Sequence, residues 1–274
     1  MDARLQLRVQ RYGWDAAARH YHTGWEQQLK PAQDTLLRMA DVKPGQRVIE
    51  TACGSGMVTL RLASFVGPTG RVTATDLSQG MIDDLANRLD ASKITNVTAL
   101  RMPAEKLDRP ENAFDAAVCA LGLMYTPDPA KAVAEMARVA KPGGTVAALV
   151  WGQRQNCGWA EVFPIVDGRV ASEVCPMFFG TGAPNALVRV FEEAGIIEVT
   201  EHRQSEFLRF EDEAAVLDAV LLGGPVALAV KRFDKATWED VRQEFLASIS
   251  PFRQPDGSYS IPAEFLTVSG TVPT

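Results

Sequence analysis

The sequence predicts an α/β fold built around a doubly wound, mostly parallel β-sheet. Between about residues 45 and 150, short runs rich in β-branched residues alternate with helical segments. This alternation is typical of βαβ units, which have parallel strands and right-handed crossovers. A glycine-bearing loop follows the first of these runs, at the kind of turn where such sheets bind ligands. With 274 residues, of which 46% are apolar, the chain is long enough to bury a large core without disulfides or metals.

The N-terminal residues 1 to about 42 are expected to form a helical cover. Apolar residues in this segment, including Trp25, Leu29 and Leu36, recur at close to a 3.6-residue period. The helical pattern ends at the turn signal Lys43-Pro44-Gly45.

The central part of the chain supplies the repeating strand–helix units. The fourth β-rich run, 114–120, is almost entirely apolar, as expected for a strand covered on both faces. Ser78 is placed to cap the helix that follows the second run. The expected strands are 47–51, 71–76, 97–102, 114–120 and 145–150, and the expected helices are 57–66, 78–91 and 128–140.

The regular pattern weakens after Trp151. Residues 152–183 contain many glycines, prolines and aromatic residues, which suits a lid or insertion better than a sheet repeat. Beyond it we expect a helix over 186–194, a strand region over 198–210 and two helices over 211–249. A break at Gly223-Gly224-Pro225 separates these two helices, and a terminal strand is expected within 265–274.

Composition excludes several classes of function. The chain has 28 Lys and Arg against 34 Asp and Glu, a net charge of -6, and so no basic field to attract nucleic acid or an anionic membrane. Its cysteines lie far apart without a CxxC pair, which argues against a metal site; they are Cys53, Cys119, Cys157 and Cys175. An uncharged apolar run of membrane-spanning length and a signal-peptide run are both missing, so a cytoplasmic protein is expected.

The glycine loop places bare backbone amides where a ligand can approach. Gly54-Ser55-Gly56 stands between an expected strand and an expected helix. The loop lacks the third glycine of the dinucleotide fingerprint and the Gly-Lys-Ser/Thr ending of a P-loop. A plain strand–helix turn is the alternative interpretation.

Asp76 ends the second expected strand, 20 residues after Gly56. A carboxylate at this position accepts hydrogen bonds from the ribose hydroxyls of an adenosine in many α/β proteins. The alternative is that Asp76 only caps the helix that starts near Ser78.

These motifs resemble those of a known family. Residues 48–56 resemble the first motif of class I S-adenosylmethionine-dependent methyltransferases, and 76–81 resemble their ribose-binding strand end. Phe114-Asp115 and residues 137–144 are similar to the small-molecule branch, which includes the C-methyltransferases of ubiquinone and menaquinone synthesis. The resemblance covers about residues 45–150. It implies a Rossmann-like fold with a seven-stranded sheet, S-adenosylmethionine as cofactor and S-adenosylhomocysteine as product.

The resemblance also implies one methyltransferase domain over residues 1–274. Its parts would be the N-terminal cover 1–42, a cofactor-binding core 43–150, a lid and substrate region with the remaining sheet elements over 151–264, and the terminal strand 265–274.

Cofactor-binding residues follow from the resemblance position by position. Tyr12, Tyr21 and Trp25 of the cover are placed to reach the cofactor or the acceptor, although simple packing explains them equally well. Ala52 stands where the family usually has glycine, and Pro103 where many relatives have an aspartate that binds the adenine amino group. The remaining implied contacts are Glu50, Gly54, Gly56, Asp76, Leu77, Met81, Met102, Ala104, Cys119, Ala120 and Leu121.

The expected acceptor is a small molecule, apolar or aromatic. Apolar residues of the second half could line its pocket, although each alone fits an ordinary core position; they are Trp159, Phe163, Met177, Phe178, Phe179, Leu221, Leu222, Phe245 and Phe252. The sequence does not single out a general base. His20 and His22 are candidates for deprotonating the acceptor, and Tyr125 is a candidate for orienting it. A nicotinamide-dependent oxidoreductase and a non-catalytic cofactor-binding protein are alternatives, and the chain is compatible with a monomer or a homodimer.

Overall fold

Seven strands form one sheet in the order β3-β2-β1-β4-β5-β7-β6. The computed structural model describes residues 3–170 and 178–274, so Cys175 and Met177 lie outside the described residues. The strands are β1 (Arg47–Thr51), β2 (Arg71–Asp76), β3 (Val97–Arg101), β4 (Phe114–Ala120), β5 (Ala140–Trp151), β6 (Ile197–Phe210) and β7 (Tyr259–Thr271). Strands β1 to β5 pair in parallel, whereas β7 runs antiparallel to both β5 and β6.

The reversal of strand order between β1 and β4 positions the candidate site. From β1 the chain builds outward to β2 and β3 on one side and then returns to β4 and β5 on the other. Ligands of open α/β sheets bind in the crevice at the carboxyl ends of the strands where the order reverses. The glycine loop and Leu121 follow strands at this edge, and Asp76 is the last residue of β2.

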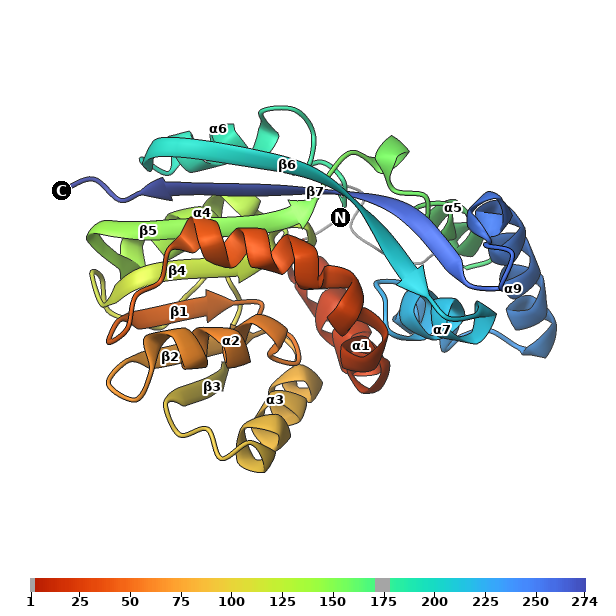
Figure 1. The fold of residues 1–274 in the computed structure, drawn as a ribbon, viewed down its shortest axis with the longest axis horizontal. Helices are drawn as coiled ribbons and strands as arrows, with labels where there is room; N and C mark the ends of the chain where they lie inside the picture. The colour runs from red at the N-terminus through yellow and green to blue at the C-terminus, as the bar shows by residue number, and fades with distance from the viewer. Residues whose placement is uncertain (1–2, 171–177) are drawn as a thin grey trace.

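Helices cover both faces of the sheet (Figure 1). Helices α1 (Ala3–Ala40), α2 (Met57–Val66) and α3 (Gln79–Ala91) lie on one face, and α4 (Pro129–Val139) and α6 (Ala186–Glu193) on the other. Three further helices lie near the end of the β6–β7 pair that contains Phe210 and Tyr259. They are α5 (Val162–Asp167), α7 (Glu213–Leu217) and α9 (Lys235–Ile249). The shorter helical turns are η1 (Leu123–Tyr125), η2 (Arg154–Asn156), η3 (Asp218–Leu222), α8 (Ala227–Val230) and η4 (Ser250–Phe252).

The starts of α3 and α4 are fixed by side-chain caps, of which Ser78 was predicted from the sequence. Ser78 accepts a hydrogen bond from the backbone N–H of Met81, and Asp128 accepts one from Lys131, at the first turns of α3 and α4. Each cap satisfies a backbone donor that has no partner within the helix. The sequence therefore determined these boundaries locally.

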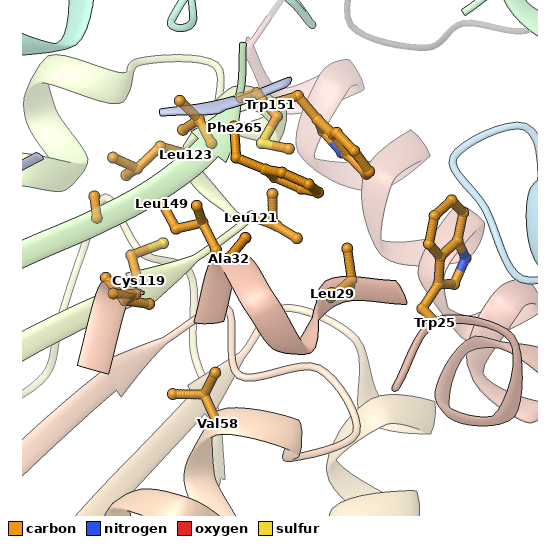
Figure 2. Close-up of a cluster of buried hydrophobic side chains, with 14 of the residues drawn as sticks. Trp25, Leu29, Ala32, Val58, Cys119, Leu121, Leu123, Leu149, Trp151 and Phe265 are labelled. Carbon is orange, nitrogen blue, oxygen red and sulfur yellow. The ribbon is translucent and has the colours of Figure 1, made fainter. Parts of the chain in front are cut away.

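Helix α1 is a single long helix that packs against the carboxyl ends of the central strands. It continues through Pro31, which lacks a backbone N–H. Trp25 packs against Trp151 with ring centroids 5.9 Å apart. Figure 2 shows Leu29 and Ala32 on the same side of α1, toward a group formed by Leu121, Leu149 and Phe265. This apolar stripe explains the 3.6-residue period of the cover.

Two strand starts differ from the sequence-based prediction. Strand β5 begins at Ala140 and passes through residues 141–144 with an irregular register, so the residues between the expected helix 128–140 and the expected strand 145–150 are part of the strand. Strand β7 begins at Tyr259, earlier than Phe265, because it pairs with β6 as far as Phe210. Both extensions depend on neighbouring strands, which a local pattern does not reveal.

The expected two helices over 211–249 are further divided. The break at residues 223–225 is present, but the first helix ends in the π-helical turn η3, and a second break separates α8 from α9. The irregular segment around η3 packs closely on α1. A Cβ on Gly24 of α1 would lie 2.9 Å from the Cα of Ala219. A Cβ on Gly223 would likewise lie 3.0 Å from the backbone carbonyl group of His20.

The carboxyl ends of β1 and β4 contain strained backbone. Ala52 and Leu121 have φ angles of 52° and 57°, a left-handed conformation that is unfavourable for residues with a Cβ. Gly122 lies against Ala52, since a Cβ on Gly122 would be 2.3 Å from the Cβ of Ala52. Glycine at position 52 would relieve the left-handed strain.

We predict that Ala52→Gly stabilises the protein by about 1 kcal/mol, the scale of the left-handed penalty. Urea unfolding of the wild type and the variant measures the change. The control is Ala86→Gly on the exposed side of helix α3, which should cost about 1 kcal/mol because glycine is a poor helix former. Equal destabilisation by both substitutions would show that Ala52 is not strained.

Candidate functional site

Asp76 stands at the centre of the strand-end crevice. The residue is only 8% exposed. Oδ2 accepts a hydrogen bond from the Gly54 backbone N–H at 2.9 Å, and Oδ1 accepts one from the Ser78 N–H at 2.8 Å. An ionised carboxylate has about four acceptor positions, so further positions are available to two hydroxyl groups.

A cavity of about 630 Å³, including its open mouth, lies at this edge of the sheet. We call it the strand-end cavity. Residues from α1, the glycine loop, the ends of β2 and β4 and the segment after β3 enclose it. They are Leu7, Gln10, Trp14, Tyr21, Ala52, Gly54, Asp76, Leu77, Met81, Met102, Pro103, Ala104, Glu105, Ala120, Leu121, Gly122, Tyr125 and Thr126.

The Tyr21 ring lies over the glycine loop. A Cβ on Gly54 would be 3.3 Å from Cε1 of Tyr21, and Gly54 has a φ angle of 53°. Glycine therefore suits both the backbone conformation and the close approach. Burial and the nearby carboxylates of Asp76 and Glu50 raise the pKa of Tyr21, so its phenol is neutral at physiological pH.

Glu50 lies behind the cavity wall and is 1% exposed. The Thr59 hydroxyl donates to its Oε2 at 2.5 Å. Burial raises the pKa of Glu50 to about 8, against the lowering effect of this hydrogen bond. Glu50 is thus mostly protonated at neutral pH and connects β1 to α2.

Helix α1 is attached to the first turn of α3 beside the cavity. Asp15 Oδ1 accepts hydrogen bonds from the Ser78 hydroxyl at 2.6 Å and from the Gly80 backbone N–H at 3.0 Å. A negative charge at a helix N-terminus is also favoured by the helix dipole. Asp15 therefore holds the cover over the strand-end cavity.

The structure brings most of the expected cofactor residues together around the strand-end cavity. Tyr125, a catalytic candidate, lines it as well. The expected residues in its wall are Ala52, Gly54, Asp76, Leu77, Met81, Met102, Pro103, Ala104, Ala120 and Leu121.

The other expected cofactor residues lie elsewhere. Tyr12 is 50% exposed on the outer side of α1, and Cys119 is completely buried in β4. Gly56 packs against α3, where a Cβ would lie 2.4 Å from Cδ1 of Leu85. Glu50 lies behind the wall, as described, and Trp25 lines a second cavity.

The two histidine candidates are outside the walls of the strand-end cavity. His20 Nδ1 lies 2.6 Å from Asp218 Oδ1, which connects α1 to η3. His22 Nδ1 lies 2.9 Å from the Ser55 hydroxyl, which connects α1 to the glycine loop. Burial, followed by the Arg88 charge, lowers the pKa of His22. Both side chains thus join α1 to its neighbours.

Three cavity residues from α1 were not predicted from the sequence. Leu7, Gln10 and Trp14 contribute to the wall together with Tyr21, which was a candidate to reach the cofactor or the acceptor. Their spacing of three, four and seven residues places them on one face of a helix. This periodicity was the available signal, and it separates Trp14 from the exposed Tyr12.

A second cavity of about 300 Å³, including its mouth, adjoins the first. We call it the aromatic cavity. It shares four wall residues with the strand-end cavity: Trp14, Tyr21, Leu121 and Tyr125. The other wall residues are Trp25, Leu29, Trp151, Trp159, Gly224 and Pro225, several of which appear in Figure 2. Within the described part of the chain, no Asp, Glu, Lys, Arg or His lines this cavity.

Only one of the residues expected to line an acceptor pocket lies in the aromatic cavity wall, within the described ranges. This residue is Trp159. Phe163 and Phe178 pack against Trp159 with centroid distances of 5.6 and 5.8 Å, as part of the surrounding core. The others outside this wall are Phe179, Leu221, Leu222, Phe245 and Phe252.

Comparisons with known proteins identify the family. A model of the methyltransferase domain family matches residues 48–144. The chain is 36% identical over 200 residues to a ubiquinone/menaquinone biosynthesis C-methyltransferase of Burkholderia mallei, and the match covers 71% of this chain and 78% of that protein. The chain belongs to the class I S-adenosylmethionine-dependent methyltransferases. The methyl donor of this family is S-adenosylmethionine.

Two other relatives match over a shorter stretch. The chain is 37% identical to a C-methyltransferase of the same name from Ectopseudomonas mendocina and 33% identical to a demethylmenaquinone methyltransferase from a Geobacillus strain. These matches cover 46% and 49% of this chain and 50% and 57% of the relatives. The chain thus spans little more than half the length of these methyltransferases.

Solved structures confirm the predicted Rossmann-like methyltransferase fold. The YcgJ protein of Bacillus subtilis aligns with a TM-score of 0.62 at 15% identity, over 89% of this chain and 99% of that protein. A putative methyltransferase of Bacillus halodurans aligns with a TM-score of 0.60 at 17% identity, over 89% of this chain and all of that one (100%). In the described ranges of this methyltransferase, no helix is long and apolar enough to cross a membrane, and no three His, Cys, Asp or Glu residues group as metal ligands.

The strand-end cavity fits the family's cofactor. Asp76 offers unoccupied acceptor positions for ribose hydroxyls beside the apolar side chains of Leu77 and Met81. The Met102 N–H donates to the Asp76 backbone carbonyl at 2.8 Å, which holds the segment after β3 next to the same carboxylate. A buried carboxylate thus lies next to apolar walls, a combination suited to a ribose joined to an adenine ring.

We predict that binding of S-adenosylhomocysteine weakens as the pH falls through about 6. Burial raises the pKa of Asp76 to about 6, despite hydrogen bonds from Ser78 and Gly54. Above this pH the carboxylate is ionised and accepts hydrogen bonds, and below it a proton occupies one acceptor position. Calorimetric titrations between pH 5 and 8 should give a dissociation constant that rises roughly tenfold per unit below the pKa.

Asp76→Asn should bind at least roughly tenfold more weakly, because a charge-assisted hydrogen bond is lost, and should not show this pH dependence. The control Asp83→Asn, at an exposed position of α3, should keep the wild-type pH profile. A wild-type profile in Asp76→Asn would contradict the assignment.

We also predict that Asp15→Ala weakens S-adenosylhomocysteine binding roughly tenfold by releasing two hydrogen bonds between α1 and α3. Hydrogen exchange over the first half of α1 should become faster. Asp34→Ala is the matched control, because Asp34 joins α1 to Arg61 of α2 away from the cavity. It should reduce stability but leave ligand affinity unchanged, whereas equal loss of affinity in both variants would refute a local role for Asp15.

Proposed function

We propose that this chain transfers the methyl group of S-adenosylmethionine to a small, apolar or aromatic acceptor bound in the aromatic cavity. One observation carries the proposal: a cavity walled by aromatic side chains shares Trp14, Tyr21, Leu121 and Tyr125 with the strand-end cavity. With the cofactor in the strand-end cavity, a shared wall would bring an acceptor in the aromatic cavity next to it. The lack of charged side chains in the described wall favours an uncharged acceptor over a highly charged one.

The cofactor supplies a methyl group that is already activated by the positive sulfonium. The protein's task is therefore to align the two reactants for in-line displacement, and positioning of this kind contributes much of the rate. Asp76 would bind the ribose hydroxyls, and Leu77 and Met81 would flank the adenine. Because Pro103 replaces an aspartate, adenine recognition would depend on the backbone of 102–104 and apolar packing.

The aromatic walls have two effects on the reaction. Trp14 and Tyr21 would exclude water from the space between the reactants. The faces of their rings also carry the negative part of an aromatic quadrupole, which stabilises a nearby positive charge.

Tyr125 is the candidate that we retain for orienting the acceptor, because it lines both cavities. Its ring packs edge-to-face against Trp14 with a centroid distance of 4.9 Å. His20 and His22 line neither cavity. The names of the relatives add a quinone-like ring as one class of acceptor for this chain.

The test has two stages. Calorimetry should give micromolar or tighter binding of S-adenosylhomocysteine and no binding of NADH. Transfer of a radiolabelled methyl group to a panel of phenols and hydroquinones should then identify an acceptor. Binding of NADH alone would support an oxidoreductase, and tight cofactor binding without turnover on any acceptor would support a non-catalytic protein.

With a turned-over acceptor, Tyr125→Phe should lower kcat roughly tenfold, the value of one hydrogen bond, and leave S-adenosylhomocysteine affinity unchanged. The control for altered packing is Phe163→Leu, at a residue just behind the cavity wall. This variant should change kcat and the affinity for S-adenosylhomocysteine by similar factors. Unchanged kcat in Tyr125→Phe would remove the orienting role.

A further inference from the structure

We propose that the indole N–H of Trp159 determines acceptor specificity by donating a hydrogen bond to an oxygen on the ring of the acceptor. The inference rests on the proposed function, because it takes the aromatic cavity as the acceptor site. It adds a chemical requirement: the acceptor is a neutral ring that carries a hydrogen-bond-accepting oxygen.

Trp159 has a buried hydrogen-bond donor that pairs with no described residue. Trp159 lines the aromatic cavity and is 1% exposed. Among the described residues, its Nε1 is buried and makes no hydrogen bond. Buried indole N–H groups usually have a partner, and an unsatisfied one is destabilising. A ligand that supplies an acceptor atom would remove this cost on binding.

Trp25, in the same wall, provides the contrast. Its Nε1 donates to the backbone carbonyls of Ala219 at 3.0 Å and Gly223 at 3.1 Å. The fold therefore satisfies the indole that joins α1 to η3. It leaves the indole of Trp159 unsatisfied beside a cavity.

The orientation of the Trp159 ring is set by its neighbours. Its centroid lies 4.9 Å from that of Trp151 and 6.1 Å from that of Trp25, and Phe178 packs perpendicular to it at 5.8 Å. The adjacent backbone is held by the Gly158 N–H, which donates to the Pro262 carbonyl at 2.8 Å. A donor held in this way is preorganised, so little side-chain entropy is lost when it binds an acceptor atom.

The absence of charged side chains from the described wall of the aromatic cavity favours a neutral ligand over a cationic one. Aromatic walls also attract ammonium groups through cation–π interactions, so an amine is the main competing ligand class. The described wall, however, has no carboxylate to neutralise a buried cation. An N–H donor also repels an ammonium group but attracts a carbonyl or phenolic oxygen. Together these features favour the neutral, oxygen-bearing ring.

Three two-ring compounds of matched shape test the inference on protein saturated with S-adenosylhomocysteine. They are 1-indanone, with an acceptor oxygen; indane, without it; and 1-aminoindane, a cation at neutral pH. Calorimetry should show 1-indanone binding about tenfold more tightly than indane, with 1-aminoindane the weakest. Because a site with an unsatisfied buried donor discriminates against ligands that lack the matching acceptor, this order follows from Trp159.

Trp159→Phe should reduce the preference for 1-indanone over indane to within about twofold. Trp25→Phe is the matched control, since it also removes an indole from the wall but one whose N–H is already bonded; it should retain the preference. Independently of any variant, the ¹⁵N-labelled indole resonance of Trp159 should move downfield with 1-indanone and not with indane. This measurement decides the question if a variant fails to fold.

The outcomes separate the two proposals. If S-adenosylhomocysteine binds but none of the three rings does, the aromatic cavity is not the acceptor site and both proposals fail. If the rings bind without preference for 1-indanone, or if Trp159→Phe keeps that preference, the inference on Trp159 fails and the proposed function stands. Tightest binding of 1-aminoindane would also overturn the inference, in favour of a cationic acceptor.

Discussion

The site depends on the hydrogen bonds that a buried carboxylate requires. Asp76 is nearly inaccessible to water, and a carboxylate in such a position must be hydrogen-bonded. Its donors are the backbone N–H groups of Gly54 and Ser78, which belong to two different strand-to-helix connections. The glycine loop and the start of α3 are therefore held together at one point. Asp15 binds the same start of α3, so the position of the cover also follows from this arrangement.

Helix α1 connects the two cavities mechanically. At successive turns it is bonded to α3 through Asp15, to η3 through His20 and Trp25, and to the glycine loop through His22. The helix also contributes wall residues to both cavities. A displacement of α1 by a ligand in one cavity would therefore alter the wall of the other.

Backbone strain is concentrated where β1 and β4 separate. The left-handed residues Ala52 and Leu121 follow these two neighbouring strands, and both line the strand-end cavity. Strained conformations of this kind persist where surrounding structure holds them, and they cluster at binding sites. The small neighbour Gly122 permits the close approach of the two strand ends. The turns after β1 and β4, which form part of the cavity wall, thus contain left-handed residues that carry a Cβ.

The sequence by itself determined the parallel core and the position of its ligand crevice. Local periodicity and spacing predict the strands near Ile49 and Ala117, the glycine loop and Asp76. Each of these strands ends where its own run of β-forming residues ends. The direction of a side chain within a motif was not encoded locally: Glu50 and Gly56 belong to the first motif, yet one bonds to α2 and the other packs on α3. Only the tertiary structure decided which face of α1 meets the strand-end cavity and how η3 packs on this helix. It also decided that Trp159 lines the aromatic cavity with an N–H that no described residue accepts. The physical reason is that these features arise from contacts between segments far apart in the chain, where helix phase and partner are selected by packing rather than by local propensity.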